Sequence, residues 1–520
     1  MLIPGMNIEL QACPAPLPIW RGSALRDEWI SAASIVAQSG GRLVSLWGAD
    51  RQHNDTSGLT VYAAYAIQQG LVILELPLAA GATAYPDLAT TFPFAGRMQR
   101  AATDLLGIVP EATHDTRPWL NHGAWPADHF PLRQNAFAQA QFPDSALNDY
   151  AFVSVQGDGV HEIPVGPVHA GIIEPGHFRF SIVGEKVLRL EERLGYTHKG
   201  IEKRFTQLPA LEAHRLAGRV SGDSTVAYAW AYCMALESAT DCAVPERARG
   251  LRALMLERER VANHLGDLGA LGNDAALAFG LAQFSRLRED WLRASLETFG
   301  HRLTMDCVVP GGVARDLDGA GAQQLNLQCD NIEREVRLLR RIYDEHAGLQ
   351  DRFTTTGRVT PALAAQLGLT GLAGRASGQA RDLRCDHAWA PYDTLAVKMA
   401  THRNGDVAAR VTVRFEEVFE SLRLIRALIS GLPAGATRTD VRLPADATFG
   451  AGWVEGWRGE VLVALELEGA ANQHRIRRCH CHDPSWQNWP VLEHAVIGNI
   501  VPDFPLINKS FNLSYSGHDL

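Results

Sequence analysis

The spacing of apolar residues changes near residue 200, and this change limits the possible folds more than any other feature of the sequence. From Ile201 to about Leu349, apolar residues recur three or four positions apart, which is the period of amphipathic helices. The helical runs are AYAWAYCMALES, RARGLRALMLERERVANHLGDLGAL, ALAFGLAQFSRLREDWLRASLETFG and NLQCDNIEREVRLLRRIYDEH, with VRFEEVFESLRLIRALISGL after Pro391. Long helices that each have one apolar face bury it by packing together, so we expect a bundle.

The first 95 residues have a different pattern, in which short apolar runs end at Gly, Asp or Pro. This pattern predicts a helix over Arg26–Gln38 and strands in GRLVSLWGAD, LTVYAAYAI and GLVILELPL. Residues 97–135 are rich in Pro, His and Trp and predict an ordered, extended arm, followed by a linker to about Tyr150. Later, FRFSIVG and KVLRLEERL flank a Gly turn and predict a β-hairpin, while GEVLVALELEG predicts a strand and LEHAVIGNIV a final helix. We therefore predict an α+β chain with a small α/β domain at residues 1–148 and a mainly α-helical domain with small β-hairpins at 149–520.

Composition excludes several classes of function. Lys+Arg 49 against Asp+Glu 58 gives a net charge of −9, which offers no electrostatic reason for binding nucleic acid or anionic lipid. No two of the eight cysteines are separated by two residues, which excludes a zinc ribbon, a ferredoxin-type cluster and a thioredoxin-like dithiol. The amino terminus lacks the pattern of a secretory signal, and the apolar stretches fall short of the ~20 residues of a spanning helix. We expect a cytoplasmic chain with protein partners, no nucleic acid and no direct membrane span.

Several segments carry a specific resemblance. Residues 166–205, GPVHAGIIEPGHFRFSIVGEKVLRLEERLGYTHKGIEKRF, resemble the start of the large-subunit family shared by membrane-bound nickel–iron hydrogenases and the quinone-site (D-type) subunit of complex I. Further motifs keep the order of that family: RVSGDSTVAYAWAYC, LERERVANHLGDLG, VVPGGVARDL, GRASGQARDLRCDHAWAPYD and DFPLINKSFNLSYSGHDL. DLLGIVPEATHDTRPWLNHGAWPADHFPLR, at 104–133, resembles the small soluble (C-type) complex I subunit that is often fused ahead of it. The resemblance covers about residues 20–520 and points to the fused large subunits of hydrogenase-4 and formate hydrogenlyase type.

The resemblance also shows what this chain lacks. The hydrogenases bind nickel and iron through two Cys-x-x-Cys pairs, and here these positions hold Ser221 and Ser224 at the first site and Ser514 and Gly517 at the second. Nickel in that setting needs soft thiolate donors, whereas a serine hydroxyl is a hard donor that stays protonated and glycine has no side chain. We expect no nickel–iron centre and no other metal at these positions. Because the chain stops at Leu520, we also expect no C-terminal extension of the kind that hydrogenases remove after metal insertion.

Three titratable residues are candidates for catalysis by resemblance. Glu202, in HKGIEK, matches the glutamate that serves proton transfer in the hydrogenases; the alternative is a carboxylate at a helix start paired with Lys199 or Lys203. His169 and His177 lie in the hairpin loop that resembles the complex I loop reaching into the quinone cavity, and His177 is the better match to its headgroup-contacting histidine. The alternative for both is an ordinary loop histidine. The quinone-contacting tyrosine of complex I has no counterpart at 221–223, and Tyr228 lies at least one helical turn beyond.

Two local clusters contain further ligand-type residues. Cys479-His480-Cys481-His482-Asp483 has metal-ligand side chains, but on a strand the cysteines share one face and the histidines the other, so an ordinary strand end is the expected reading and structural zinc the alternative. The segment RDLRCDH holds a charged group that we expect to form a salt-bridged network around the pocket: Arg381, Asp382, Arg384, Asp386 and His387.

The function implied by the resemblance is that of a cytoplasmic-face subunit of a membrane-bound, complex I-like respiratory complex. The chain would take part in proton-coupled electron transfer from an iron–sulfur cluster of a small partner subunit to a quinone or another acceptor, beside antiporter-like membrane subunits. We expect the chain to bind no cofactor itself, with a quinone in the pocket as the possible exception. The resemblance to NADH dehydrogenases implies NAD binding and quinone binding for the complex as a whole. The alternative is a redox-inert scaffold that couples or holds together an ion-translocating complex.

Overall fold

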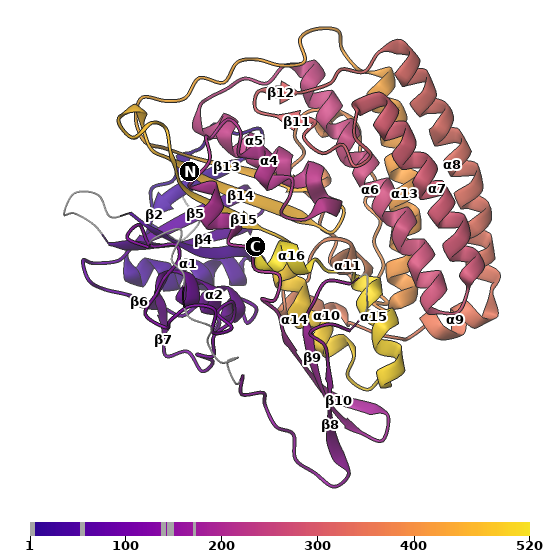
Figure 1. The fold of residues 1–520 in the computed structure, drawn as a ribbon, viewed down its shortest axis with the longest axis horizontal. Coiled ribbons are helices and arrows are strands. Elements are labelled where there is room, and N and C mark those ends of the chain that lie inside the picture. The colour runs from indigo at the N-terminus through magenta and orange to yellow at the C-terminus, as the bar shows by residue number, and fades with distance from the viewer. Residues whose placement is uncertain (1–5, 52–57, 137–141, 143–149, 170–172) are drawn as a thin grey trace.

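In the computed structural model, residues 6–51, 58–136, 142, 150–169 and 173–520 are described, and Figure 1 shows their arrangement. The N-terminal part forms a five-stranded sheet in the order β1-β2-β5-β4-β3, in which only β2 and β5 pair in parallel. Its strands are β1 (Gln11–Ala12), β2 (Ile19–Ser23), β3 (Arg42–Asp50), β4 (Leu59–Ile67) and β5 (Gly70–Pro77). Helix α1 (Arg26–Gln38) and these strands confirm the prediction from the apolar runs.

The predicted arm is only partly extended. Its first residues belong to α2 (Ala95–Leu106), which packs over β3, and β7 (Val109–Glu111) then pairs with β6 (Ala84–Pro86). The prediction was wrong for residues 97–106, because the many Pro, His and Trp residues that suggested an extended arm all lie after this helix. The predicted domain boundary between residues 148 and 149 lies outside the described residues and stays a prediction.

A three-stranded sheet extends from the body of the molecule. It contains β8 (Val160–Val165), β9 (His177–Val183) and β10 (Lys186–Arg193), in the order β10-β9-β8. The β9–β10 pair is the predicted hairpin, and Figure 1 shows it projecting beyond the rest of the fold.

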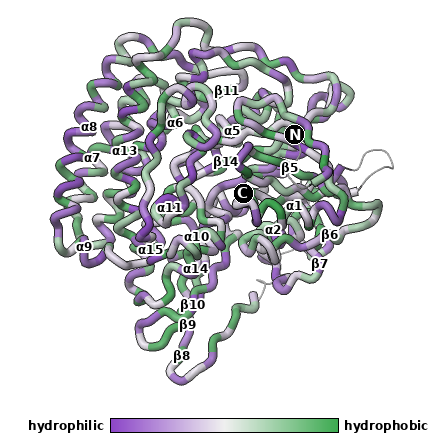
Figure 2. The backbone as a smooth tube through the Cα atoms, turned by 180° about the vertical axis from the view of Figure 1, so that it is seen from behind, coloured by the Kyte–Doolittle hydropathy of each residue, from purple (hydrophilic) through white to green (hydrophobic). Residues whose placement is uncertain are grey.

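Four long helices form the predicted bundle: α6 (Glu246–Asp274), α7 (Ala278–Phe299), α8 (Gly319–Glu345) and α13 (Val407–Ser430). Asp318 and Asp406 cap the N-termini of α8 and α13 by accepting hydrogen bonds from backbone N–H groups within the first turn. Along α7 and α8, hydrophilic and hydrophobic segments alternate, as expected for amphipathic helices (Figure 2). None of the helices in the described ranges combines the length and the apolar character needed to cross a bilayer.

Helix α5 (Thr225–Ala239) lies on the C-terminal sheet, which consists of β13 (Thr448–Glu455), β14 (Glu460–Leu467) and β15 (Ile476–His482). The helix approaches so closely that a Cβ on Gly452 would lie 2.0 Å from the carbonyl oxygen of Ala231. Only glycine fits there, and this contact sets how closely the middle of α5 lies on β13.

Short elements complete the fold. They are α3 (Ile201–Phe205), α4 (His214–Ala217), β11 (Val308–Val309), β12 (Gly312–Val313), α9 (Ala347–Phe353), α10 (Pro361–Gln366), α11 (Gly371–Ala376), α12 (Leu383–Asp386), α14 (Ser485–Ala495), α15 (Phe504–Phe511) and α16 (Tyr515–Asp519). The final helix predicted near LEHAVIGNIV is α14, but it ends at Ala495, and α15 and α16 follow it.

Candidate functional site

The structure brings together the two segments that hold Ser221, Ser224, Ser514 and Gly517. Ser221 and Ser224 lie in the turn before α5, and Ser514 caps α16, which contains Gly517. Ser221 Oγ lies 2.9 Å from Ser514 Oγ, and the N–H of Gly517 donates to Ser514 Oγ at 2.9 Å. The start of α5 and the C-terminal tail therefore meet through hydroxyl groups.

An ion pair between a buried arginine and a half-buried aspartate lies beside these hydroxyls. Arg458, from the turn between β13 and β14, donates to the Asp223 carboxylate at 2.8 Å and to Ser224 Oγ at 3.2 Å, and Ser221 donates to Asp223 at 2.7 Å. Burial alone would raise the pKa of Asp223, but the charge of Arg458 and the bonds from Arg458 and Ser221 outweigh it and lower the pKa to about 2. A guanidinium thus places a fixed positive charge next to the hydroxyls.

Asp483 fills the space next to Gly517. Its carboxylate accepts from the Tyr228 hydroxyl at 2.8 Å and from the Ser485 N–H at 2.8 Å. A Cβ on Gly517 would lie 2.5 Å from Asp483 Oδ2 and 2.8 Å from Ser514 Oγ. Any side chain at position 517 would therefore have to displace a carboxylate that two hydrogen bonds hold in place.

Gly517→Ala is expected to lower the free energy of unfolding by about 1–3 kcal/mol, because the new methyl group overpacks the site. Asp483→Ala should relieve the overlap, so the loss caused by Gly517→Ala should be smaller in the Asp483→Ala background. Urea denaturation of the four proteins of this double-mutant cycle measures the coupling. Gly222→Ala is the matched control, because a Cβ at Gly222 meets nothing within 4 Å. Equal losses in both backgrounds would contradict the overlap.

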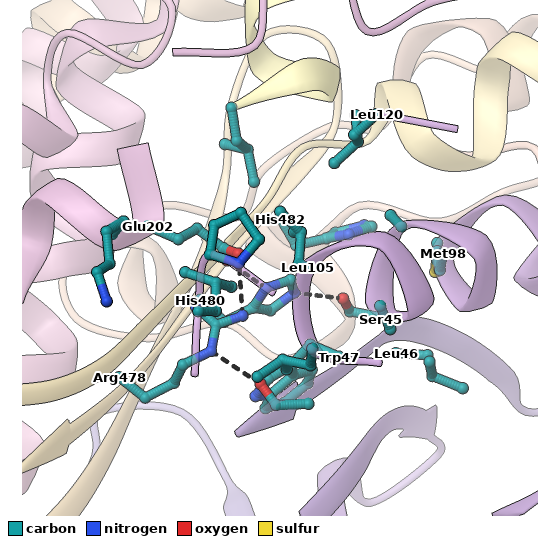
Figure 3. Close-up of a pocket in the computed structure, with 18 of the residues that line it drawn as sticks. Ser45, Leu46, Trp47, Met98, Leu105, Leu120, Glu202, Arg478, His480 and His482 are labelled. Atoms are coloured by element: carbon teal, nitrogen blue, oxygen red, sulfur yellow. Dashed lines mark hydrogen bonds and ion pairs between the residues drawn. The ribbon is translucent and has the colours of Figure 1, made fainter. Parts of the chain in front are cut away.

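Glu202 has different partners from those expected for a carboxylate at a helix start. It lies buried in α3 and accepts from Arg478 at 2.9 Å and from His480 Nδ1 at 2.8 Å, both on β15 (Figure 3). The alternative interpretation, a pairing with Lys199 or Lys203, was wrong, because both ammonium groups donate to backbone carbonyls instead. Burial would raise the pKa of Glu202, but the charge of Arg478 and the hydrogen bonds from Arg478 and His480 more than offset it and lower the pKa to about 2.

A small cavity of about 50 Å³ lies beside Glu202 and His480, where they meet the N-terminal sheet. Ser45 and Trp47 reach it from β3, and Met98 and Leu105 from α2 (Figure 3). His480 Nε2 lies 2.7 Å from Ser45 Oγ, and its ring stacks on Trp47 with centroids 4.6 Å apart. The polar wall of the cavity thus joins both parts of the chain.

His169 lies in the loop between β8 and β9 and His177 is the first residue of β9, whereas Glu202 lies in α3. His177 Nδ1 is 3.2 Å from the carbonyl oxygen of Gly166, its ring contacts Phe152, and burial lowers its pKa. His169 Nδ1 is 3.2 Å from the carbonyl oxygen of Pro167. The same loop touches the tail, because the Ser516 N–H donates to Glu174 at 3.1 Å. The hairpin loop, the start of α5 and the tail are therefore neighbours.

The charged residues of the RDLRCDH segment divide into two groups. Arg384 pairs with Asp382 at 2.6 Å and with Glu257 of α6 at 3.0 Å, all buried. Asp386 accepts from the backbone N–H of Asp382 at 2.9 Å, which places it at the edge of this network. Two members lie elsewhere: Arg381 donates to the carbonyl oxygen of Gly40, and His387 packs against Trp453.

The Cys479–Asp483 cluster lies on β15, with its side chains on alternate faces. Cys479 and Cys481 pack into the apolar core, whereas His480 binds Glu202 and His482 Nε2 lies 3.0 Å from Gln487 Oε1. Throughout the described ranges, no three His, Cys, Asp or Glu side chains are grouped so that they could hold a metal ion.

Sequence reasoning missed the residues that complete the site. Arg458, Asp483 and Ser45 come from distant segments, and nothing in their local sequence indicates which groups they meet. His480 was considered only as a metal ligand. One feature of the sequence could have identified His480 as part of the site: alternation along the strand places Arg478, His480 and His482 on one face, away from the cysteines.

Comparisons with known proteins agree with this architecture. Residues 24–141 match the family described as "Respiratory-chain NADH dehydrogenase, 30 Kd subunit", and residues 267–449 match "Respiratory-chain NADH dehydrogenase, 49 Kd subunit". Formate hydrogenlyase subunit 5 of Escherichia coli is 30% identical over 93% of this chain and 86% of its own length. Hydrogenase-4 component G of the same organism is 31% identical over 86% of this chain and 78% of its own length.

A solved structure supports the same relationship. A chain in the "membrane-bound sulfane sulfur reductase (MBS), an archaeal respiratory membrane complex" is 25% identical, with a TM-score of 0.65, and the match covers 70% of this chain and 99% of that one. The order of the two matched families and the identity to the relatives both agree with the α+β organisation described above. The chain therefore belongs to the family of fused large subunits that includes formate hydrogenlyase subunit 5 and hydrogenase-4 component G, and joins domains of the 30 Kd and 49 Kd types of respiratory-chain NADH dehydrogenase.

Proposed function

We propose that this protein is a nickel-free large subunit of a membrane-bound, complex I-like respiratory complex, in which it takes part in proton-coupled electron transfer to a quinone or another acceptor. A small iron–sulfur subunit would supply the electrons, and antiporter-like membrane subunits would hold the complex at the cytoplasmic face of the membrane. The observation that carries the proposal is the contact of the start of α5 with the tail at Ser221 and Ser514, beside the loop that carries His177. The start of α5 and the C-terminal tail stay in contact although they carry hydroxyls at the positions where hydrogenases carry metal-binding thiolates.

The donor set does not fit a nickel–iron centre. The hydroxyls of Ser221 and Ser514 bond to each other, and the guanidinium of Arg458 donates to Ser224. A cation beside that position would repel a metal ion, and hard hydroxyl donors do not suit nickel. The carboxylate of Asp483 occupies the space that a cysteine side chain at position 517 would need. Metal analysis of the purified complex should therefore find iron from the partner subunit and no stoichiometric nickel, and stoichiometric nickel would contradict the proposal.

Electron transfer is tested in the assembled complex, with a reduced viologen as donor and a short-chain quinone as acceptor. His177→Gln should slow quinone reduction about 100-fold, because glutamine cannot exchange a proton. His161→Gln is the matched control, since His161 is exposed on the neighbouring strand β8 and its Nδ1 lies 3.3 Å from the carbonyl oxygen of Gly159. Unchanged quinone reduction in His177→Gln would remove this residue from the mechanism.

A specific observation favours a second candidate, the redox-inert coupling subunit. Tyr228, Asp483, Asp223 and Arg458 satisfy one another's hydrogen bonds and fill the pocket between α5 and the tail. A site closed in this way ties the two segments together without needing a substrate. Under this candidate, the wild-type complex reduces no quinone although its iron–sulfur subunit accepts electrons from the viologen.

A further inference from the structure

One buried histidine links the two parts of the chain through both of its ring nitrogens. His480 is 7% exposed, and its Nδ1 lies 2.8 Å from Glu202 Oε1 while its Nε2 lies 2.7 Å from Ser45 Oγ. Both distances are those of good hydrogen bonds. Ser45 comes from β3 of the N-terminal sheet, whereas Glu202 and His480 come from α3 and β15 of the large domain, so the chain of three groups crosses the interface between the domains.

The partners fix the protonation pattern of the imidazole ring. An ionised carboxylate can only accept, so His480 Nδ1 carries a hydrogen and donates it to Glu202. In a neutral ring the other nitrogen is then an acceptor, and the Ser45 hydroxyl donates to it. The ring therefore already has the arrangement of a proton shuttle, with an acceptor on one side and a donor on the other.

Burial keeps His480 neutral at rest. Burial lowers its pKa, the nearby Glu202 acts in the opposite direction, and Arg478 adds to the lowering. The other titratable groups that line the cavity are Lys203 in α3, His198 before this helix, and His482, two residues further along β15. Trp47 adds an uncharged ring against the imidazole face.

The cavity next to His480 has the size for water and not for a quinone. Its volume of about 50 Å³ is enough for one or two water molecules, given about 30 Å³ for each in the liquid. Ser45, Glu202 and His480 all line the cavity, so water inside it has polar partners. Leu46, Met98 and Leu105 form the apolar part of its wall. Water could thus reach the imidazole from the side of the N-terminal sheet.

We propose that His480 is a proton-transferring residue that connects water in this interdomain cavity to Glu202. A hydrated proton in the cavity water passes to the Ser45 hydroxyl, whose own proton moves to Nε2 and leaves Ser45 neutral. The Nδ1–H bond then breaks, an O–H bond forms on Glu202, and the ring stays neutral with its hydrogen on Nε2. One proton enters and one leaves the ring, and no electron moves. The inference rests on the proposed function only in assuming that Glu202 uses the proton.

The kinetic test uses the assembled complex and the viologen-to-quinone assay. His480→Gln should lower the rate about 100-fold, because the amide can form hydrogen bonds but cannot carry a proton. His480→Ala should be equally slow and should recover activity when free imidazole is added. Recovery of this kind separates proton transfer from a merely structural role, since imidazole restores no contact of the polypeptide.

His264→Gln is the matched control. His264 is a buried histidine whose Nε2 lies 2.8 Å from Glu417, a pair of the same geometry in the helical bundle and away from the cavity. Its replacement should leave the rate close to that of the wild type once the complex is assembled. An active complex whose rate is unchanged by His480→Gln, or whose His480→Ala variant does not respond to imidazole, would overturn the proposal.

A second measurement does not depend on turnover. The ring hydrogen on Cε1 of a histidine exchanges slowly with deuterium where water reaches the imidazole, and mass spectrometry of peptides detects it. His480 should exchange clearly faster than His264, which is fully buried. If the wild-type complex reduces no quinone, the proposed function fails, but this exchange still tests the role of His480. Exchange at His480 that is no faster than at His264 would overturn the proposal that water reaches this histidine.

Discussion

Arg375→Met is expected to lower the free energy of unfolding by about 3–5 kcal/mol, the range for removing one partner of a buried ion pair. Arg375 in α11 is fully buried and lies 2.7 Å from Glu417 of α13 and 2.9 Å from Glu455 of β13, with Asp382 at 3.8 Å. Methionine has a similar length but takes the guanidinium away from Glu417 and Glu455, while Asp382 keeps its pair with Arg384. Urea denaturation followed by tryptophan fluorescence measures the loss, because Trp453 lies buried nearby on β13.

Arg381→Gln serves as the control for this prediction. It removes an arginine from the same stretch of chain, but Arg381 donates only to the backbone carbonyl of Gly40, at 3.3 Å. The expected loss is below about 1 kcal/mol, as for most substitutions away from buried charge networks. Similar losses in both variants, or a stable Arg375→Met protein, would show that the network does not hold the bundle to the C-terminal sheet.

The helices and strands with a clear apolar period could be predicted from the sequence. Helix α1 and the strands β3, β4 and β5 lie where the runs place them, because each run buries one face of an element against a neighbour. The short helices α15 and α16 were not predicted, since five or eight residues give too few turns for a period to show. Their positions depend on contacts with α6, α13 and α14 that only the fold supplies.

The site could be predicted in part, through the family resemblance. It identified the segments that meet at Ser221 and Ser514, and it singled out Glu202. It could not identify Arg458 or Asp483 as the groups that fill the pocket, because the partners that place them there, Asp223 and Tyr228, lie more than 200 residues away in sequence. Pairings between charges depend on tertiary geometry, and no local pattern encodes that geometry.

Glu202 is the residue for which the structure changes the chemical expectation most. A carboxylate with a pKa of about 2 stays ionised at neutral pH, so it holds a transferred proton only briefly. The low pKa therefore suits a Glu202 that passes a proton from a donor to an acceptor better than a Glu202 that stores protons. It also makes Glu202 a structural anchor, since Arg478 would be buried without a counter-charge if it were removed.

Glu202→Gln is therefore expected to lower the free energy of unfolding at pH 7 by about 3 kcal/mol, which corresponds to the gap between an ordinary value of 4.5 and a folded pKa of about 2. Because the folded pKa is depressed, the carboxylate stabilises the fold fully above pH 4.5 and loses this effect as the pH falls through 2. The difference between the two proteins should shrink to less than about half at pH 3. Glu212→Gln, at an exposed site 4.0 Å from Arg215, should show little difference at any pH. A difference for Glu202→Gln that stays constant from pH 7 to pH 3 would mean that the residue acts through packing and not through its charge.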